Sequence, residues 1–149
     1  MKVRLKKKLD DALSINSFKP QSSMETVREK LRSPVAAGSW DDSLMARFHA
    51  LMVRDRLFLQ PSLSLGDVAA RLHTNKTYIS KLVNNNYGVS FPDLLNALRV
   101  DYAQEYLLSH REARQEEVAK ACGFLSASTF NNIFRKVAGV TPKMWLAGK

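Results

Sequence analysis

Two groups of polar side chains in this sequence recur at helical spacing, and each could present hydrogen-bonding atoms along one helix face. The first group is Lys76, Thr77, Ser80, Lys81 and Asn84, and the second is Ser128, Asn131, Asn132 and Arg135. Positions three or four residues apart share a helix face, so each group would act as one surface. Ammonium, guanidinium, hydroxyl and amide groups pair with base edges in the major groove of DNA and with its phosphates. A solvated helix face has a similar composition, so the elements that position these residues decide between the two interpretations.

Residues 115–145 have the pattern of a helix-turn-helix. Val118, Ala119 and Cys122 place small apolar groups on one face of a helix. Gly123 comes directly after them and can take the left-handed conformation that ends a helix, and Phe124 is placed to fill the corner behind it. The pattern therefore predicts a first helix that ends in a tight turn.

A second helix is predicted to start at Ser126, with its polar face formed by the second group above. The apolar stripe on its opposite face is Phe130, Ile133, Phe134 and Val137. Gly139 is expected to end this helix. Thr141 then supplies a capping hydroxyl and Pro142 the residue best tolerated at a first helical position, which predicts a last short helix containing Trp145.

Residues 64–90 repeat this arrangement. Ser64 and Asp67 have the spacing of a capping box, in which each side chain accepts a bond from the other's backbone. The helix that they start would bury Val68, Ala69 and Leu72. After His73, and with Thr74 at its start, a second short helix would carry the first polar group on its outer face. Its inner face would be Tyr78, Ile79, Leu82 and Val83.

The two units match closely enough to indicate an internal duplication. Val68-Ala69-x-x-Leu72 matches Val118-Ala119-x-x-Cys122 at an offset of 50, and Ile79, Leu82, Val83 and Gly88-Val89-Ser90 match Phe130, Ile133, Phe134 and Gly139-Val140-Thr141 at an offset of 51. Generic helix packing would not repeat the glycine and the capping hydroxyl as well. The turns of the two units should therefore differ by one residue.

A long helix is expected to join the units. Ser90, Pro92 and Asp93 form another capping box with proline in the first turn. The helix that follows is apolar on more than one side, as a rigid spacer between two subdomains needs to be. Its apolar positions are Leu94, Leu95, Leu98, Tyr102, Ala103, Tyr106 and Leu107.

A scaffold helix is expected before the first unit, capped by Asp41 or Asp42. Its buried face would be Leu44, Phe48, Leu51 and Met52, with Arg47, Arg54 and Arg56 outside. Residues 1–40 lack comparable periodicity and mix proline, serine and charge, so we interpret them as a basic, flexible N-terminal tail or linker. The N-terminus has no apolar stretch of signal-peptide or membrane-span length, which predicts a cytoplasmic protein.

The charge of the chain is compatible with a polyanionic partner. The 149 residues carry a net charge of +9, and nine basic against four acidic residues lie in residues 1–32. Residues 33–149 contain fourteen basic and ten acidic residues, so the predicted folded part is only mildly basic. Double-stranded DNA is the expected partner, although a basic balance by itself is also a common solubility feature.

The sequence predicts no enzyme, cofactor or metal site. His49, His73 and His110 are scattered and have no other ligand residues at metal-binding spacing. Cys122, the single cysteine, cannot form an internal disulfide. It lies on the predicted core stripe without a histidine nearby in sequence, so we expect a buried structural thiol and no nucleophile.

Together, the two units and the signature ACGFLSASTFNNIFRKVAGVTP resemble the DNA-binding domain of AraC/XylS-type bacterial transcription regulators. The segments GDVAARLHTNKTYIS and FPDLLNALRVDYAQEYLL look most like the version found in Bacteroidetes regulators. The resemblance implies an all-α, homeodomain-like fold at residues 41–149, with two helix-turn-helix subdomains at about 64–90 and 115–147 and a linker helix at about 91–109. Two positions depart from the family pattern. Trp145 replaces the usual Tyr or Phe, and Asn132 stands where many members carry a basic residue.

The same resemblance implies a sequence-specific regulator whose two recognition helices enter successive segments of the major groove. Ser126, Thr129 and Thr141 would add phosphate contacts from helix starts, although plain helix caps explain them equally well. Residues 1–40 are too few and too polar for the family's usual effector-binding β-domain. The chain is therefore expected to be either a single-domain regulator of the MarA type or part of a longer protein with a separate sensor region. An alternative is a module that binds RNA polymerase or another regulator without reading DNA.

Overall fold

The computed structural model describes residues 42–149, and the expected N-terminal tail at residues 1–40 lies outside this range. Every regular element within it is helical, which confirms the predicted all-α class. In chain order these elements are α3 (Asp42–His49), the π-helical turn η2 (Ala50–Arg54), the 3₁₀ turn η3 (Leu57–Leu59), α4 (Leu65–Arg71), α5 (Lys76–Tyr87), α6 (Phe91–Ser109), α7 (Gln115–Ala121), α8 (Ala127–Ala138) and α9 (Pro142–Ala147). None of these helices is both long and apolar enough to cross a membrane.

The predicted scaffold helix is α3, which continues directly into the wider π-helical turn η2. Phe48 and Met52 on the expected inner face are fully buried, whereas Leu51 is only half-buried. The N–H of Asp55 donates to the carbonyl of Ala50 at 2.9 Å, a bond across five residues that a regular α-helix lacks. The spacing of apolar residues, interpreted at 3.6 residues per turn, does not indicate this change from α-helix to π-helix. Asp41, one of the two expected caps, lies outside the described residues.

The first helix-turn-helix consists of α4 and α5. Its capping box forms as predicted, because the Asp67 N–H donates to Ser64 Oγ and the Ser64 N–H donates to Asp67 Oδ2, both at 3.0 Å. The turn passes through His73 in the left-handed conformation, with φ of 57°. Arg47 of α3 donates to the carbonyl of Leu72 at 3.3 Å and so ties the scaffold helix to the end of α4.

The second helix-turn-helix consists of α7 and α8, and α9 closes the domain. α4 and α7 contain seven residues each, and α5 and α8 contain twelve each. Gly123 takes the left-handed position that His73 takes in the first unit. The N–H groups of Phe124 and Thr74 then donate to the equivalent carbonyls of Ala119 and Ala69, both at 2.9 Å. The additional residue in the second turn is Leu125, whose side chain is 74% exposed.

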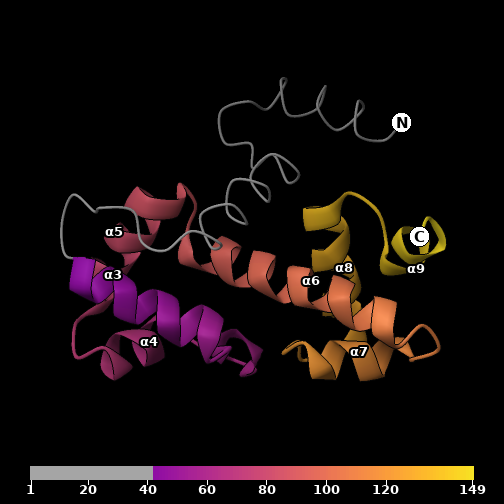
Figure 1. Cartoon of the computed structure of the whole chain (residues 1–149), viewed down its shortest axis with the longest axis horizontal. Helices are drawn as coiled ribbons and strands as arrows, with labels where there is room; N and C mark the ends of the chain where they lie inside the picture. The colour runs from indigo at the N-terminus through magenta and orange to yellow at the C-terminus, as the bar shows by residue number, and fades with distance from the viewer. Residues whose placement is uncertain (1–41) are drawn as a thin grey trace.

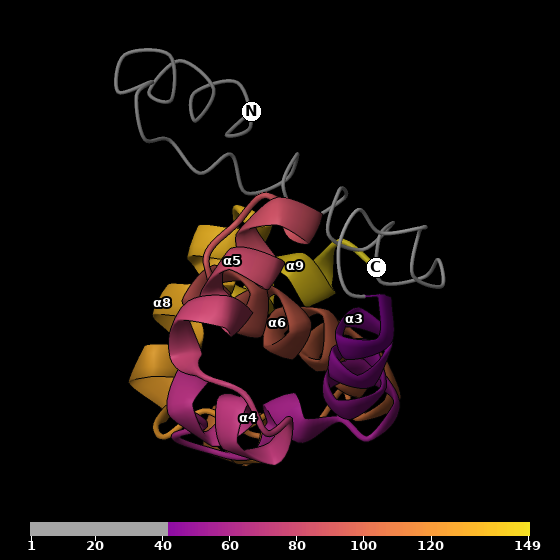
Figure 2. The ribbon, with the colours of Figure 1, turned by 90° about the vertical axis from the view of Figure 1, so that its left-hand side faces the viewer.

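α6 carries one unit at each end. Figure 1 shows α6 across the middle of the molecule, with α3, α4 and α5 around its first half and α7, α8 and α9 around its second. In Figure 2 the molecule is seen from the first unit, and α8 and most of α5 lie on the side of α6 that is remote from α3. The two second helices therefore lie toward the same side of the molecule.

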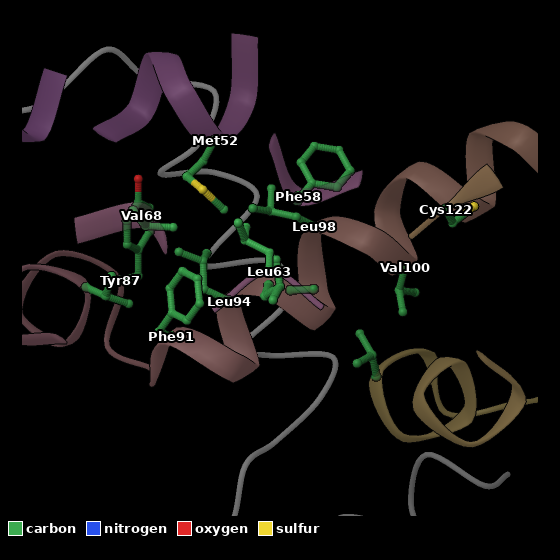
Figure 3. Packing of buried hydrophobic residues seen from close by; sticks show 14 of the residues in the cluster. Met52, Phe58, Leu63, Val68, Tyr87, Phe91, Leu94, Leu98, Val100 and Cys122 are labelled. Carbon is green, nitrogen blue, oxygen red and sulfur yellow. The ribbon is translucent and has the colours of Figure 1, made fainter. Parts of the chain in front are cut away.

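A continuous apolar core runs through both units and α6. Figure 3 shows Leu94 and Leu98 of α6 among Met52 of η2, Phe58 of η3 and Val68 of α4, whereas Val100 points to the other side. In the second unit the rings of Phe130 and Phe134 meet edge-on, with centroids 5.7 Å apart. The two-sided apolar character predicted for the linker helix is thus used to pack against both units. Its buried residues are Phe91, Leu94, Leu95, Ala97, Leu98, Arg99, Val100, Ala103 and Leu107.

Candidate nucleic-acid interface

The outer face of α5 carries the first group of polar side chains. Lys76, Thr77, Lys81 and Asn84 are exposed, and Ser80 is half-buried. Ile79, Leu82 and Val83 on the opposite face are buried, which fixes the outward orientation of the polar group. One amide hydrogen of Asn84 is directed back to the carbonyl of Ser80 at 3.2 Å. The predicted inner and outer faces are therefore those that the fold produces.

The residue that caps the start of α5 is not the one expected from the sequence. Thr74 was the predicted helix start, but the N-cap is Asn75, whose Oδ1 accepts a bond from the N–H of Tyr78 at 2.9 Å. Thr74 instead belongs to the turn, since its N–H donates to the carbonyl of Ala69. Asparagine is among the strongest N-cap residues, and an alignment of the two units places Asn75 opposite Ser126. This alignment is the signal that could have located the cap in the sequence.

The outer face of α8 carries the second group, with one member turned inward. Ser128, Asn132 and Arg135 are exposed. Asn131 is half-buried, and its amide nitrogen donates both to Gln115 Oε1 and to the carbonyl of Ala127, the latter at 2.9 Å. Both amide hydrogens of Asn131 are thus engaged inside the protein. We therefore interpret Asn131 as a residue that holds α7 against α8.

The three expected phosphate-binding hydroxyl residues lie at helix starts. Ser126 Oγ accepts a bond from the N–H of Thr129 at 3.1 Å and donates to Thr129 Oγ1 at 3.0 Å. Thr141 Oγ1 accepts from the N–H of Met144 at 3.2 Å. Ser126 and Thr129 are exposed, and Thr141 is half-buried. All three side chains therefore have a structural role as part of helix caps, whatever further contacts they make.

The charges on the two outer faces are unequal. Lys76 and Lys81 on α5 form no ion pair with any carboxylate in the described part of the chain. The predicted face of α8 has Arg135 as its only charged member, followed by Lys136 in the last turn. An unpaired ammonium group keeps its full charge for an incoming phosphate or guanine. The predicted face of α5 therefore carries two positive charges, and that of α8 carries one.

The environment of Cys122 is that of a structural thiol. Cys122 is fully buried, and burial raises the pKa of its thiol from 9.0 to about 12. A thiol in this environment is protonated near neutral pH and cannot act as a nucleophile. Within residues 42–149, no three histidine, cysteine or acidic side chains gather in a way that could hold a metal ion.

One buried charged residue escaped the sequence interpretation. Arg99 lies in the middle of α6 with 8% of its surface exposed, and its guanidinium donates to two backbone carbonyls. An arginine between Leu98 and Val100 in an otherwise apolar stretch was the signal for it. Such a residue is rarely buried without a partner, so its position in the sequence already implied one.

A comparison with protein families identifies the fold family. A family model described as a helix-turn-helix domain matches residues 68–148, more than half of the chain. The HTH-type transcriptional activator RhaR of Cronobacter sakazakii is 34% identical over 67 residues, which are 45% of this chain and 23% of that protein. The chain belongs to the AraC/XylS-type helix-turn-helix family. It spans less than a third of the length of RhaR and of the curated relatives from Bacillus subtilis, Vibrio cholerae and Salmonella typhimurium.

Solved structures of AraC-type domains share this architecture. The C-terminal domain of AraT, a response regulator from Geobacillus stearothermophilus, superimposes with a TM-score of 0.66 at 29% identity, over 72% of this chain and 86% of that one. The DNA-binding domain of AdpA, a global transcriptional factor solved with a target DNA, gives a TM-score of 0.59 at 23% identity. That match covers 70% of this chain and 90% of the AdpA chain and concerns the fold alone.

Proposed function

We propose that this AraC/XylS-type chain is a sequence-specific DNA-binding transcription regulator that inserts α5 and α8 into successive major-groove segments of double-stranded DNA. The observation that carries the proposal is the presence of two matched helix-turn-helix units at the ends of one helix, with both second helices on the same side. α6 contains 19 residues. A helix of that length spans about 28 Å, comparable with the roughly 34 Å of one duplex turn.

The residues proposed to contact DNA fall into two sets. On α5, Lys76 and Lys81 can reach guanine acceptors or phosphates, while Thr77, Ser80 and Asn84 can meet either base edges or the backbone. On α8, Ser128, Asn132 and Arg135 form the exposed set. Ser126, Thr129 and Thr141 are proposed to add phosphate contacts from the helix starts. In this proposal the contact set on α5 supplies two positive charges and the set on α8 supplies one, so α8 relies more on neutral hydrogen-bonding groups.

Footprinting on both strands of a selected binding site tests the two-headed mode. Sites are first selected from a random DNA pool with the whole chain. We expect two protected patches whose centres lie about 10 base pairs apart on one face of the duplex. Protection of a single patch would contradict the insertion of both recognition helices and leave one unit without a DNA role.

A second candidate function is a module that binds RNA polymerase or another regulator without reading DNA. The weakly charged outer face of α8, with Asn131 engaged internally, is the observation that favours it. Salt titration with random duplex DNA separates the two candidates. Phosphate neutralisation makes log affinity fall linearly with log salt, at about 0.9 per phosphate contacted. A protein-binding module would instead show no measurable DNA affinity at any salt concentration.

A further inference from the structure

Arg99, in the middle of α6, contacts both the η3 turn that leads into the first unit and the turn of the second unit. The Nε of Arg99 donates to the carbonyl of Phe58 at 2.7 Å, and its Nη2 donates to the carbonyl of Gln60 at 2.8 Å. Both carbonyls belong to the end of η3, the turn that leads the chain into the first unit. Unpaired carbonyls at the end of a helical turn carry partial negative charge, which suits a guanidinium.

The same guanidinium lies against the turn of the second unit. The Cζ of Arg99 is 5.8 Å from the ring centroid of Phe124. A Cβ atom on Gly123 would stand 3.0 Å from Arg99 Nε and 2.9 Å from the carbonyl oxygen of Leu59. The end of η3, Arg99 and the second turn are therefore in direct contact, although they are far apart in the sequence.

This contact resists movement of one unit relative to the other. Arginine presents its donors in a rigid planar fork, so two carbonyls bound to one guanidinium are held in a fixed relation. Arg99 is 8% exposed, so its charge is held in a partly dehydrated environment, and this burial lowers the pKa of its guanidinium. Moving η3 away from α6 would separate the Arg99 guanidinium from the two carbonyls before water could solvate it. Leaving a buried charge without a partner is unfavourable.

We infer that Arg99 is a positioning residue that clamps the two helix-turn-helix units and so sets the distance and rotation between α5 and α8. Binding of two linked modules gains affinity only when both sites can be engaged together. If the joint is rigid, the protein binds tightly only to DNA whose two half-sites are spaced to match the distance between α5 and α8. This consequence rests on the proposed function, whereas the mechanical coupling of the units does not.

A measurement without DNA tests the clamp directly. Spin labels are attached to Asn85→Cys on α5 and Lys136→Cys on α8, both exposed positions outside the proposed contact sets. The native Cys122 is buried and should remain unlabelled. Electron–electron double resonance should give one narrow distance distribution, and Arg99→Met should widen it about twofold or more, because the methionine side chain has no N–H group to donate to either carbonyl.

The control is Arg47→Met. Arg47 also donates to a backbone carbonyl, that of Leu72, but this contact joins the scaffold helix α3 to the first unit and does not involve the second unit. Its replacement should leave the distribution narrow. If Arg99→Met does not fold by circular dichroism, Arg99→Gln, which cannot bridge both carbonyls as a fork, takes its place. A distribution as narrow as that of the parent protein in the folded Arg99 variant would overturn the inference.

A second arm measures affinity for duplexes whose two half-sites are about 9 to 13 base pairs apart. The parent protein should prefer one spacing by about tenfold or more, and Arg99→Met should reduce this preference to less than about threefold. Affinity for a single half-site should not change. A parent protein without any spacing preference would refute the two-headed function, while the distance measurement would still decide the role of Arg99. An unchanged preference in Arg99→Met would refute the clamp alone.

Discussion

Individual side chains on the two recognition helices differ in how free they are to meet a ligand. Lys81 is exposed on α5 and forms no ion pair in the described part of the chain. Asn131 on α8, although equally polar, has both amide hydrogens bound within the protein. A hydrogen bond already made inside the protein must be broken before the group can read a base. Exposed residues such as Lys81 are therefore the better targets for mutation.

Lys81→Ala should weaken binding to the preferred DNA site by about 1–3 kcal/mol and relax sequence preference at one base pair. Lys81 lies one turn beyond Thr77 on the outer face of α5, and in the proposed binding mode its long side chain would reach the middle of the groove. Binding isotherms on the preferred site and on single-base variants of it measure both effects.

The matched control for Lys81 is Arg54→Ala, which removes one exposed positive charge at the end of η2. It should change affinity little. Equal weakening on specific and random DNA, with a salt slope smaller by about one unit, would show that Lys81 holds a phosphate. Unchanged affinity on both kinds of DNA would mean that this face of α5 does not meet the duplex.

Gly123→Ala should be much more destabilising than Gly88→Ala. Both glycines have positive φ, 91° and 75°, so either substitution costs about 1–2 kcal/mol of backbone strain. A Cβ on Gly88 would meet nothing within 4 Å, whereas one on Gly123 would press on backbone carbonyls of η3. We expect a further loss of about 1–3 kcal/mol for Gly123→Ala from this overpacking. Urea denaturation of the two variants measures the difference, and equal losses would contradict the close approach.

At the level of elements, the starts of the two second helices are capped, and we propose that they also contact phosphate. Each second helix begins with a residue whose side chain accepts a backbone bond, Asn75 before α5 and Ser126 before α8. The free N–H groups and the dipole of a helix start also attract phosphate oxygens. A substitution that keeps the cap but changes its charge can separate these two functions.

Ser126→Asp should keep the stability of the protein and weaken DNA binding by about tenfold or more, because a carboxylate caps a helix well but repels phosphate. Ser126→Ala should instead lower the free energy of unfolding by about 1 kcal/mol. Thermal unfolding and DNA titration of both variants give the comparison. Parental DNA affinity in Ser126→Asp would mean that Ser126 serves only as a cap.

For the whole molecule, the common core makes stability depend on groups buried in either unit. Cys122 in the second unit and Tyr87 in the first are both buried in their neutral forms, and burial raises the pKa of each. Within residues 42–149, the Tyr87 hydroxyl also has no hydrogen-bond partner. Ionisation of either group inside the core is unfavourable, so unfolding should become coupled to proton release in alkaline solution.

The free energy of unfolding should decrease as pH rises from about 9 toward 12. The unfolded thiol loses its proton near 9.0, whereas the folded thiol keeps it to about 12, so the unfolded state binds fewer protons in this range. Urea titrations at a series of pH values measure the slope. Cys122→Ala should show a shallower decrease, with Tyr87 contributing to the remainder. An identical slope in Cys122→Ala would contradict the raised pKa of this thiol.

The sequence by itself determined the elements and their faces. Apolar residues at helical spacing, capping residues such as Ser64 and Ser126, and glycines at the turns are local signals, because helix formation and capping depend on neighbours within a few residues. The match between residues 64–90 and 115–147 indicated that the same two-helix unit occurs twice. The fold confirms both units and the linker helix at Phe91–Ser109.

The tertiary structure alone decided what depends on residues distant in the chain. The inward engagement of Asn131 requires Gln115 on the neighbouring helix, and the role of Arg99 requires carbonyls 39 and 41 residues away. The widening of the scaffold helix into η2 follows from a backbone bond that side-chain periodicity does not reveal. Local patterns indicate which face of a helix is buried, but only packing determines which polar groups on that face, or at its edge, find a partner.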